Sequence, residues 1–120
     1  MNIQEAVNAL KKNKKVVSIL QFGSSVTEKH FRDIDLCIFT SKSLSLKEKL
    51  KLQRNLPEKY DISFYDDLPL NLKREVLKGK VLFTNDYYSL LKEIPYVERE
   101  YPQYERFLEM YHQCRMEELA

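Results

Sequence analysis

The 120-residue sequence is poor in the residues that build the most recognisable sites. It has two glycines, two cysteines, four prolines and no tryptophan. Gly23 and Gly79 lie too far apart to form the GxxxxGK[ST] loop that binds phosphates in many nucleotide-binding proteins. Cys37 and Cys114 have no second cysteine or histidine at zinc-site spacing. We therefore expect reduced thiols in a cytoplasmic protein, with Cys37 buried inside an apolar run.

Charge of one sign and long apolar runs are also missing. Lysine and arginine total 20 and the acids total 18, which gives a formal net charge of +2. This balance does not favour general binding to DNA. No stretch approaches the roughly 20 apolar residues of a membrane span, and the N-terminus has no apolar signal-peptide core. A basic cluster at residues 11–15 is interpreted as a solvated helix end, with an RNA contact as the alternative.

The order of apolar patterns predicts one α/β (α+β) domain over residues 1–120, with a mixed sheet flanked by helices and a helical C-terminus. Apolar content is 43%, as in globular proteins. Pro95 and Pro102 predict breaks or bends in the C-terminal third, since proline is costly inside a helix. The patterns predict helices over residues 3–13, 46–55 and 68–78 and strands over 16–22, 33–40, 60–65 and 81–83.

Two carboxylates open the second predicted strand, in the sequence DIDLCIF. Side chains alternate across a strand, so Asp33, Asp35 and Cys37 share one face and the aliphatic residues between them share the other. Unpaired carboxylates are very costly to bury side by side. They therefore face solvent, a buried partner or a cation, and each of these readings is open for an isolated DxD pair.

A third acid, Asp61, lies in the next predicted strand, within YDISFY. If the two strands are neighbours, Asp61 completes an acidic cluster with Asp33 and Asp35. Mg²⁺ prefers oxygen ligands, usually one or two carboxylates with waters and substrate phosphates. A pair of such ions can orient the attacking and leaving oxygens of a displacement at phosphorus, and Asp61 can accept a proton as a general base.

A Gly-Ser pair follows the first predicted strand and precedes a short segment with a helical pattern. Gly23 lets the backbone approach a ligand closely, and the amides at a helix N-terminus bind phosphate. The hydroxyl of Ser24 can donate to a phosphate oxygen. Gly-Ser alone is a weak signal. Its combination with a following DxDL strand and a further acidic strand is much more specific.

With these motifs in place, the sequence resembles a minimal nucleotidyltransferase of the DNA polymerase beta superfamily. The matching segments are FGSS (22–25), DIDL (33–36) and YDIS (60–63), and residues 68–86 resemble the helix and short strand that follow the third acid in these proteins. The resemblance implies a mixed sheet flanked by helices and the transfer of a nucleoside monophosphate, usually from ATP with Mg²⁺, to an acceptor hydroxyl.

The resemblance also implies roles for individual residues. Asp33, Asp35 and Asp61 correspond to the acids that bind the metal and carry catalysis, and Gly23, Ser24 and Ser25 to the segment that holds the nucleotide. The spacer of eight residues between Ser24 and Asp33 is shorter than is usual in these proteins and has no second glycine. Because all three acids are present, we favour an active enzyme.

Proteins of this minimal type are often similar to antitoxins that are paired with a helical HEPN-domain ribonuclease toxin. The resemblance therefore implies AMPylation of a protein hydroxyl, with a HEPN toxin as the favoured acceptor. Two alternatives stay open: an antitoxin that acts only by binding its partner, and transfer to a small molecule. A chain of 120 residues leaves no room for a dedicated acceptor domain, which favours a protein acceptor.

An apolar and aromatic stripe is predicted along the C-terminal helical third. Its residues recur at helical spacing: Val97, Tyr101, Tyr104, Leu108 and Tyr111. We expect the stripe to cover the domain's own sheet. The alternative is a surface for a partner or for a homo- or hetero-oligomer, because an uncovered remainder would be an aromatic patch.

Four further charged residues were weighed as members of the site. Asp66 and Asp67 rival Asp61 as the third acid, but turn or helix-cap roles are favoured because they precede a helical pattern. Lys78 and Lys80 flank Gly79. A solvated turn is favoured for them, with contact to the nucleotide as the alternative.

Overall fold

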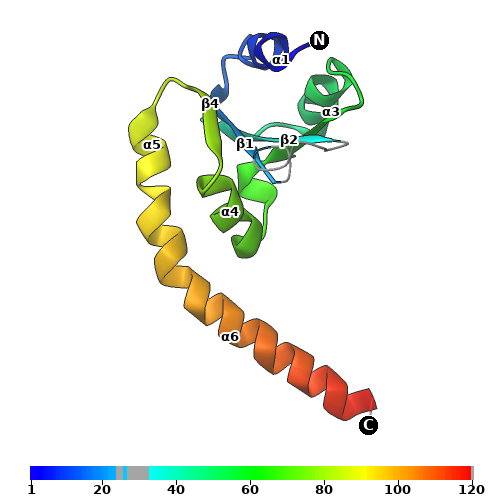
Figure 1. Ribbon diagram of the computed structural model, residues 1–120, viewed down its shortest axis with the longest axis vertical. Coiled ribbons are helices and arrows are strands. Elements are labelled where there is room, and N and C mark those ends of the chain that lie inside the picture. The colour runs from blue at the N-terminus through cyan, green and yellow to red at the C-terminus, as the bar shows by residue number, and fades with distance from the viewer. Residues whose placement is uncertain (24–25, 27–32, 120) are drawn as a thin grey trace.

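The computed structural model describes residues 1–23, 26 and 33–119 of the chain (Figure 1). Ser24, Ser25 and the side chain of Cys114 lie outside the described part, so the predictions made for them stay predictions. The elements follow in this order: α1 (Ile3–Leu10), β1 (Val16–Phe22), β2 (Ile34–Thr40), α3 (Leu46–Arg54), β3 (Tyr60–Phe64), the 3-10 helix η1 (Tyr65–Asp67), α4 (Leu70–Leu77), β4 (Lys80–Thr84), α5 (Tyr87–Leu91) and α6 (Glu93–Leu119).

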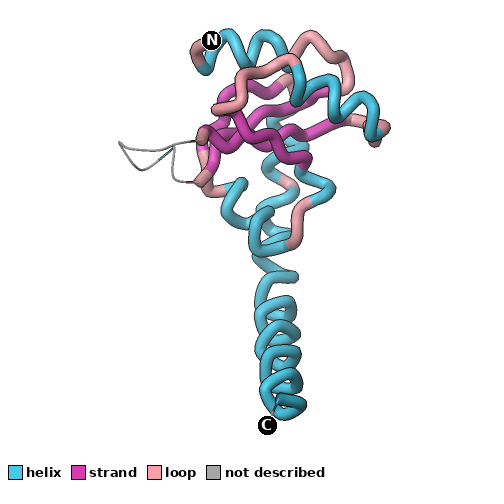
Figure 2. Tube along the Cα trace, turned by 90° about the vertical axis from the view of Figure 1, so that its right-hand side faces the viewer, coloured by secondary structure: helices cyan, strands magenta, loops and turns pink. Residues whose placement is uncertain are grey.

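The four strands form one mixed sheet in the order β3-β2-β1-β4. β1 pairs antiparallel with both β2 and β4, whereas β2 and β3 run parallel. The sheet is the middle layer of the body, and helices lie on both of its faces (Figure 2). The predicted fold class is confirmed, and so is the neighbourhood of the two acidic strands.

Each face of the sheet carries its own hydrophobic cluster. Ile34, Leu36 and Ile38 of β2 point to the face that α1 and α3 cover. Cys37 and Phe39 point to the opposite face, where η1, α4 and α5 pack. Strand alternation thus divides the apolar run of β2 between two cores, as the sequence predicted. Cys37 is fully buried, and burial raises the pKa of its thiol.

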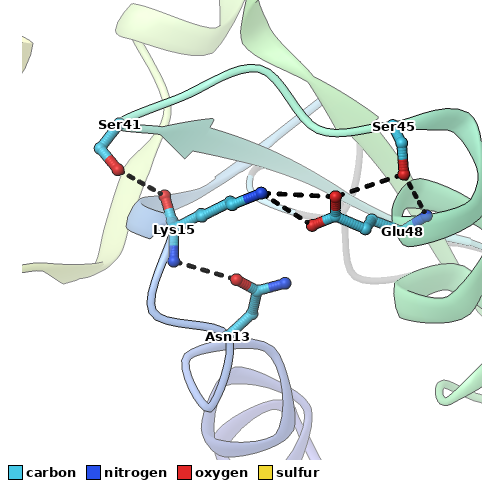
Figure 3. A network of polar contacts seen from close by, with 5 residues as sticks. All are labelled: Asn13, Lys15, Ser41, Ser45 and Glu48. Atoms are coloured by element: carbon cyan, nitrogen blue, oxygen red, sulfur yellow. Dashed lines mark hydrogen bonds and ion pairs between the residues drawn. The ribbon is translucent and has the colours of Figure 1, made fainter.

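A polar network fastens α3 to the start of β1 (Figure 3). The ammonium of Lys15 pairs with the carboxylate of Glu48 at 3.2 Å, and the hydrogen bond from Lys15 lowers the pKa of that carboxyl. The backbone amide of Glu48 donates to Oγ of Ser45, which caps the N-terminus of α3 at 3.2 Å. Asn13 and Ser41 bind the backbone of Lys15 from both sides.

Gly79 ends α4 for a reason that the sequence did not reveal. Its φ is not positive, so it is not a left-handed helix cap. A Cβ at this position would lie 2.2 Å from the backbone carbonyl oxygen of Gln21 in β1. Glycine is therefore required because the turn between α4 and β4 packs directly on the backbone of β1.

The C-terminal helix differs from expectation at Pro102. α6 continues through this residue as a single helix, so the predicted break there is wrong. The chain does break just before Pro95, between α5 and α6, and Pro95 falls in the first turn of α6. Proline is tolerated in a first turn because the amide that it lacks has no partner within the helix.

The predicted C-terminal stripe packs on helix α4 rather than on the sheet. The guanidinium of Arg74 in α4 pairs with Glu98 at 3.1 Å and lies 4.3 Å from the ring centroid of Tyr101. The hydroxyl of Tyr104 donates to Oδ1 of Asn71 at 3.4 Å. Beyond this contact α6 leaves the body and runs alone to the C-terminus (Figure 1). The expectation that the stripe covers the sheet is corrected accordingly.

Within the described part of the chain, none of the helices combines the length and the apolar character that crossing a bilayer demands.

We predict that Gly79→Ala destabilises the fold by about 1–3 kcal/mol, the usual cost of forcing extra volume into a packed site. Steric conflict should outweigh the entropic gain from replacing glycine, because the opposing atom belongs to the backbone of β1 and not to a flexible side chain. Urea unfolding measures the change. Lys80→Ala, an exposed change next in sequence, is the control and should stay within about 0.5 kcal/mol. A loss of similar size in both variants would contradict this packing.

Candidate active site

Two of the three predicted acids are brought together by the pairing of β2 and β3. Asp35 lies opposite Asp61 in the parallel register, between the pairs Ile34–Tyr60 and Leu36–Ile62. Neighbouring strands lie about 4.8 Å apart, and residues in register point to the same face. The two carboxylates therefore start from adjacent positions on one side of the sheet.

Asp33 stands just before β2 and is exposed. The amide of the next residue, Ile34, donates to the carbonyl of Lys59 at 2.7 Å, which fixes the entry of β2 against the entry of β3. Asp33 thus lies at the same end of these strands as Asp35 and Asp61. The structure brings all three predicted acids to one edge of the sheet.

Gly23 closes the site from the other side of Asp35. Asp35 is the register partner of Phe22, the last residue of β1, and Gly23 follows directly. A Cβ on Gly23 would lie 2.7 Å from Oδ2 of Asp35, and its φ of +78° belongs to the left-handed region that favours glycine. Its carbonyl accepts the amide of Val26 at 3.2 Å, which begins a turn. The predicted proximity of glycine and acids is confirmed.

The electrostatics of the site show in Asp35. Its side chain is half-buried, whereas Asp33 and Asp61 are exposed. Desolvation raises the pKa of the Asp35 carboxyl above its ordinary value of 3.8, and the negative charges of Asp61 and then Asp33 raise it further. Like charges that are gathered without a partner cost free energy, so this arrangement is suited to a cation.

The donor set fits magnesium. All three side chains offer carboxylate oxygens, which are the ligands that Mg²⁺ prefers. Among the residues that the structure describes, no three His, Cys, Asp or Glu side chains are gathered closely enough to hold one ion by themselves. This agrees with the usual binding of Mg²⁺ through one or two carboxylates, with water and substrate phosphates completing the shell.

An open groove of about 260 Å³ adjoins Gly23. Its lining comes from the end of β1 and from the turn between α4 and β4: Gly23, Val26, Glu75, Lys78 and Gly79. The sequence reading had weighed Lys78 as a nucleotide contact but had not placed Val26, Glu75 or Gly79 at the site. The signal was the scarcity of glycine, since both glycines of the chain lie at this groove.

The rival acids take structural roles. Asp66 and Asp67 form the 3-10 turn η1 after β3. Asp67 pairs with Lys49 at 2.7 Å, and Asp66 lies near the buried Cys37 on the α4 side of the sheet. The turn role that the sequence favoured is confirmed, although Pro69 and not either aspartate precedes α4 as its N-cap.

The fold and the acidic edge of the sheet define a nucleotidyltransferase. The family model described as "Polymerase beta, Nucleotidyltransferase" matches residues 4–88, and the chain belongs to this family. The match ends before α6, so the projecting helix lies beyond the family's own pattern.

Curated and solved relatives carry more specific names. A Methanocaldococcus jannaschii protein named "Putative protein adenylyltransferase MJ1547" is 33% identical over 75 residues, which cover 60% of this chain and 59% of the relative. The chain therefore spans about three fifths of the curated relative that it matches. The match to that relative is local.

The fold is similar to that of chains in solved toxin–antitoxin complexes. One complex was crystallised with AMP-PNP, and its chain superposes with a TM-score of 0.71 at 18% identity, with 100% of both chains covered. Another contains a tri-AMPylated Shewanella oneidensis HEPN toxin with its MNT antitoxin, and the TM-score is 0.61 at 18% identity, with 98% and 95% covered. At such identities the likeness shows the fold alone.

We predict that Asp35→Asn raises the resistance of the fold to urea at pH 7. Because the folded-state pKa of Asp35 lies above 3.8, its contribution to stability is fully present below pH 3.8 and is lost as the pH rises through the raised pKa. An asparagine cannot ionise, so the gain should be present at pH 7 and vanish below pH 3.8.

Asp67→Asn is the matched control, since this aspartate is ion-paired with Lys49 and should gain no stability when neutralised. Unfolding midpoints at both pH values measure the effect. A lower midpoint for Asp35→Asn at pH 7, or a gain that persists in acid, would show that repulsion at the site is absent.

Proposed function

We propose that the protein transfers AMP from ATP to a hydroxyl group of a protein acceptor, with Mg²⁺ as the metal. The observation that carries the proposal is the register of Asp35 and Asp61 on one sheet face, closed by Gly23 on the opposite side. Membership of the nucleotidyltransferase family gives the reaction class. The name of the archaeal relative supports AMP as the group and a protein as its acceptor.

The chemistry is a displacement at the α-phosphorus of ATP. The acceptor oxygen forms a bond to this phosphorus while the bond to the bridging oxygen of the β-phosphate breaks. Pyrophosphate leaves with the electron pair, and the proton of the hydroxyl passes to a base. Asp61 is proposed as that base because it is exposed and stands beside Asp35.

Asp33, Asp35 and Asp61 are proposed to hold the metal, and Gly23 with Ser24 and Ser25 the nucleotide. When bound, Mg²⁺ neutralises the phosphates and the carboxylates and activates the attacking oxygen. Asp35 is held in place by its register with both β1 and β3, so its position needs no rearrangement on binding.

The acceptor is proposed to be a HEPN-type toxin, which would make the protein an antitoxin. Supporting this, a structural neighbour is an MNT antitoxin in complex with an AMPylated HEPN toxin. The distal part of α6 supports a partner of some kind, since it extends from the body with exposed apolar side chains. These are Phe107, Met110 and Tyr111, at 64%, 61% and 48% exposure.

A second candidate function is neutralisation of the partner by binding alone. The same exposed residues of α6 favour it, because they form an apolar surface remote from the acids (Figure 1). The two functions differ in whether the acidic edge of the sheet is needed.

We predict that Asp35→Asn abolishes the transfer of label from α-³²P-ATP to the acceptor, with a loss of roughly 100-fold or more. Even residues that only orient metal ligands contribute 10–100-fold. The wild-type protein, Mg²⁺ and lysate of the source organism should label one protein band, whose identity names the acceptor. Asp67→Asn should retain full transfer, since this residue only pairs with Lys49.

Transfer that persists in Asp35→Asn would overturn the enzymatic proposal. Label found only on a small molecule would replace the protein acceptor by a small one. Loss of labelling with intact neutralisation of a purified partner would favour the second function.

We predict that the double variant Phe107→Ala, Met110→Ala raises the KM for the protein acceptor by about tenfold or more, as expected when apolar anchors of an interface are truncated. ATP binding should not change, because both residues lie in the projecting part of α6. Glu109→Ala, an exposed residue of the same helix, serves as the control. A normal KM for the double variant would remove this surface from acceptor binding.

A further inference from the structure

The groove beside Gly23 has a single basic residue along its lining, Lys78. Lys78 is the C-cap of α4, and its neighbour Glu75 is the only acid of the lining. Within the described part of the chain, the ammonium of Lys78 forms no ion pair with a carboxylate. The comparable cations Lys15, Lys49 and Arg74 are each paired with an acid within 3.2 Å. Lys78 is thus a cation without a protein partner that stands at the margin of an acidic site.

The position of Lys78 is fixed by the second glycine. Gly79 rests on the carbonyl of Gln21, and the amide of Gly79 donates to the carbonyl of Val76 at 2.9 Å. The turn that bears Lys78 is therefore held against the last residues of β1, from which Gly23 also emerges. A cation fixed by backbone packing is pre-organised for a ligand, because little order is lost when the ligand binds.

The proposed substrate requires such a cation. The triphosphate of ATP is a polyanion, and it approaches a site where three carboxylates already repel one another. The metal compensates charge on the side of the acids. On the groove side, Lys78 can compensate the charge of the phosphates that lie away from the reacting phosphorus, as lysine does at many phosphate sites.

We propose that the groove between Gly23 and the α4–β4 turn receives the β- and γ-phosphates of the nucleotide, and that Lys78 binds them and stabilises the departing pyrophosphate. The inference rests on the proposed function and names the part of the substrate that this groove takes. A competing explanation is that Lys78 only complements the negative end of the α4 dipole, which is a common role for lysine at a helix C-terminus.

Equilibrium binding separates the two explanations. Titration calorimetry with Mg²⁺ and ATP, ADP or AMP is performed on the wild-type protein and on Lys78→Ala, without acceptor. Lys78→Ala is expected to weaken ATP binding by about tenfold, the effect of losing one charge-assisted contact. The affinity for AMP should stay unchanged, so that the preference of the protein for ATP over AMP falls by the same factor.

Two matched variants complete the experiment. Lys80→Ala removes the same charge on the far side of Gly79, from a residue that does not line the groove, and should bind ATP normally. Lys78→Arg keeps the charge and should retain most of the affinity. Thermal unfolding of each variant confirms that it is folded.

The outcomes are distinct. Unchanged ATP binding in Lys78→Ala overturns the inference and leaves the proposed function intact. An equal loss for ATP and AMP also overturns it, because the contact would not concern the terminal phosphates. A wild-type protein that binds neither nucleotide with Mg²⁺ overturns the proposed function, and this inference with it. A selective loss for ATP, absent in Lys80→Ala, supports the assignment.

Discussion

The parallel pairing of β2 with β3 is the constraint on which the site depends. Antiparallel pairing joins β1 to its other neighbours and can be made by short connections, but the parallel pair needs a crossover, which α3 supplies. That crossover is tied to the sheet by the contact between Lys15 and Glu48 (Figure 3). A shift of one residue in this pairing would turn Asp61 to the opposite face and separate it from Asp35. The same register that completes two hydrophobic clusters therefore also sets the distance between the acids.

The acidic edge of the sheet works against the stability of the body. Half-buried Asp35 is desolvated and repelled by its neighbours, while apolar clusters on both faces of the sheet hold the strands in place. Such a conflict between local electrostatics and packing is typical of sites that bind a charged ligand, because the ligand relieves it. The chain tolerates the conflict at the exposed ends of strands, where water still reaches Asp33 and Asp61.

Much of this could be predicted from the sequence. Alternation within DIDLCIF gave both faces of β2, and turn and cap residues gave most element boundaries, because these signals are local. The adjacency of Asp61 and Asp35 was a conditional expectation, since periodicity does not say which strands pair. The packing of Gly79 on Gln21 joins residues far apart in sequence and could not be seen. Pro102 was misjudged because α6 is held by contacts with α4 on its preceding turns, which outweigh the local preference of proline.

The attachment of α6 has a consequence for how such a protein diversifies. Its contacts with the body are made to α4 and α5 through residues up to Tyr104, including the fully buried Val97. The stretch beyond Tyr104 contributes nothing to the sheet that carries the acids. Substitutions there are free of the demands of the core, so a lineage can alter the surface it shows to other molecules while its chemistry stays constant. The helix thus behaves as an exchangeable module on a conserved engine.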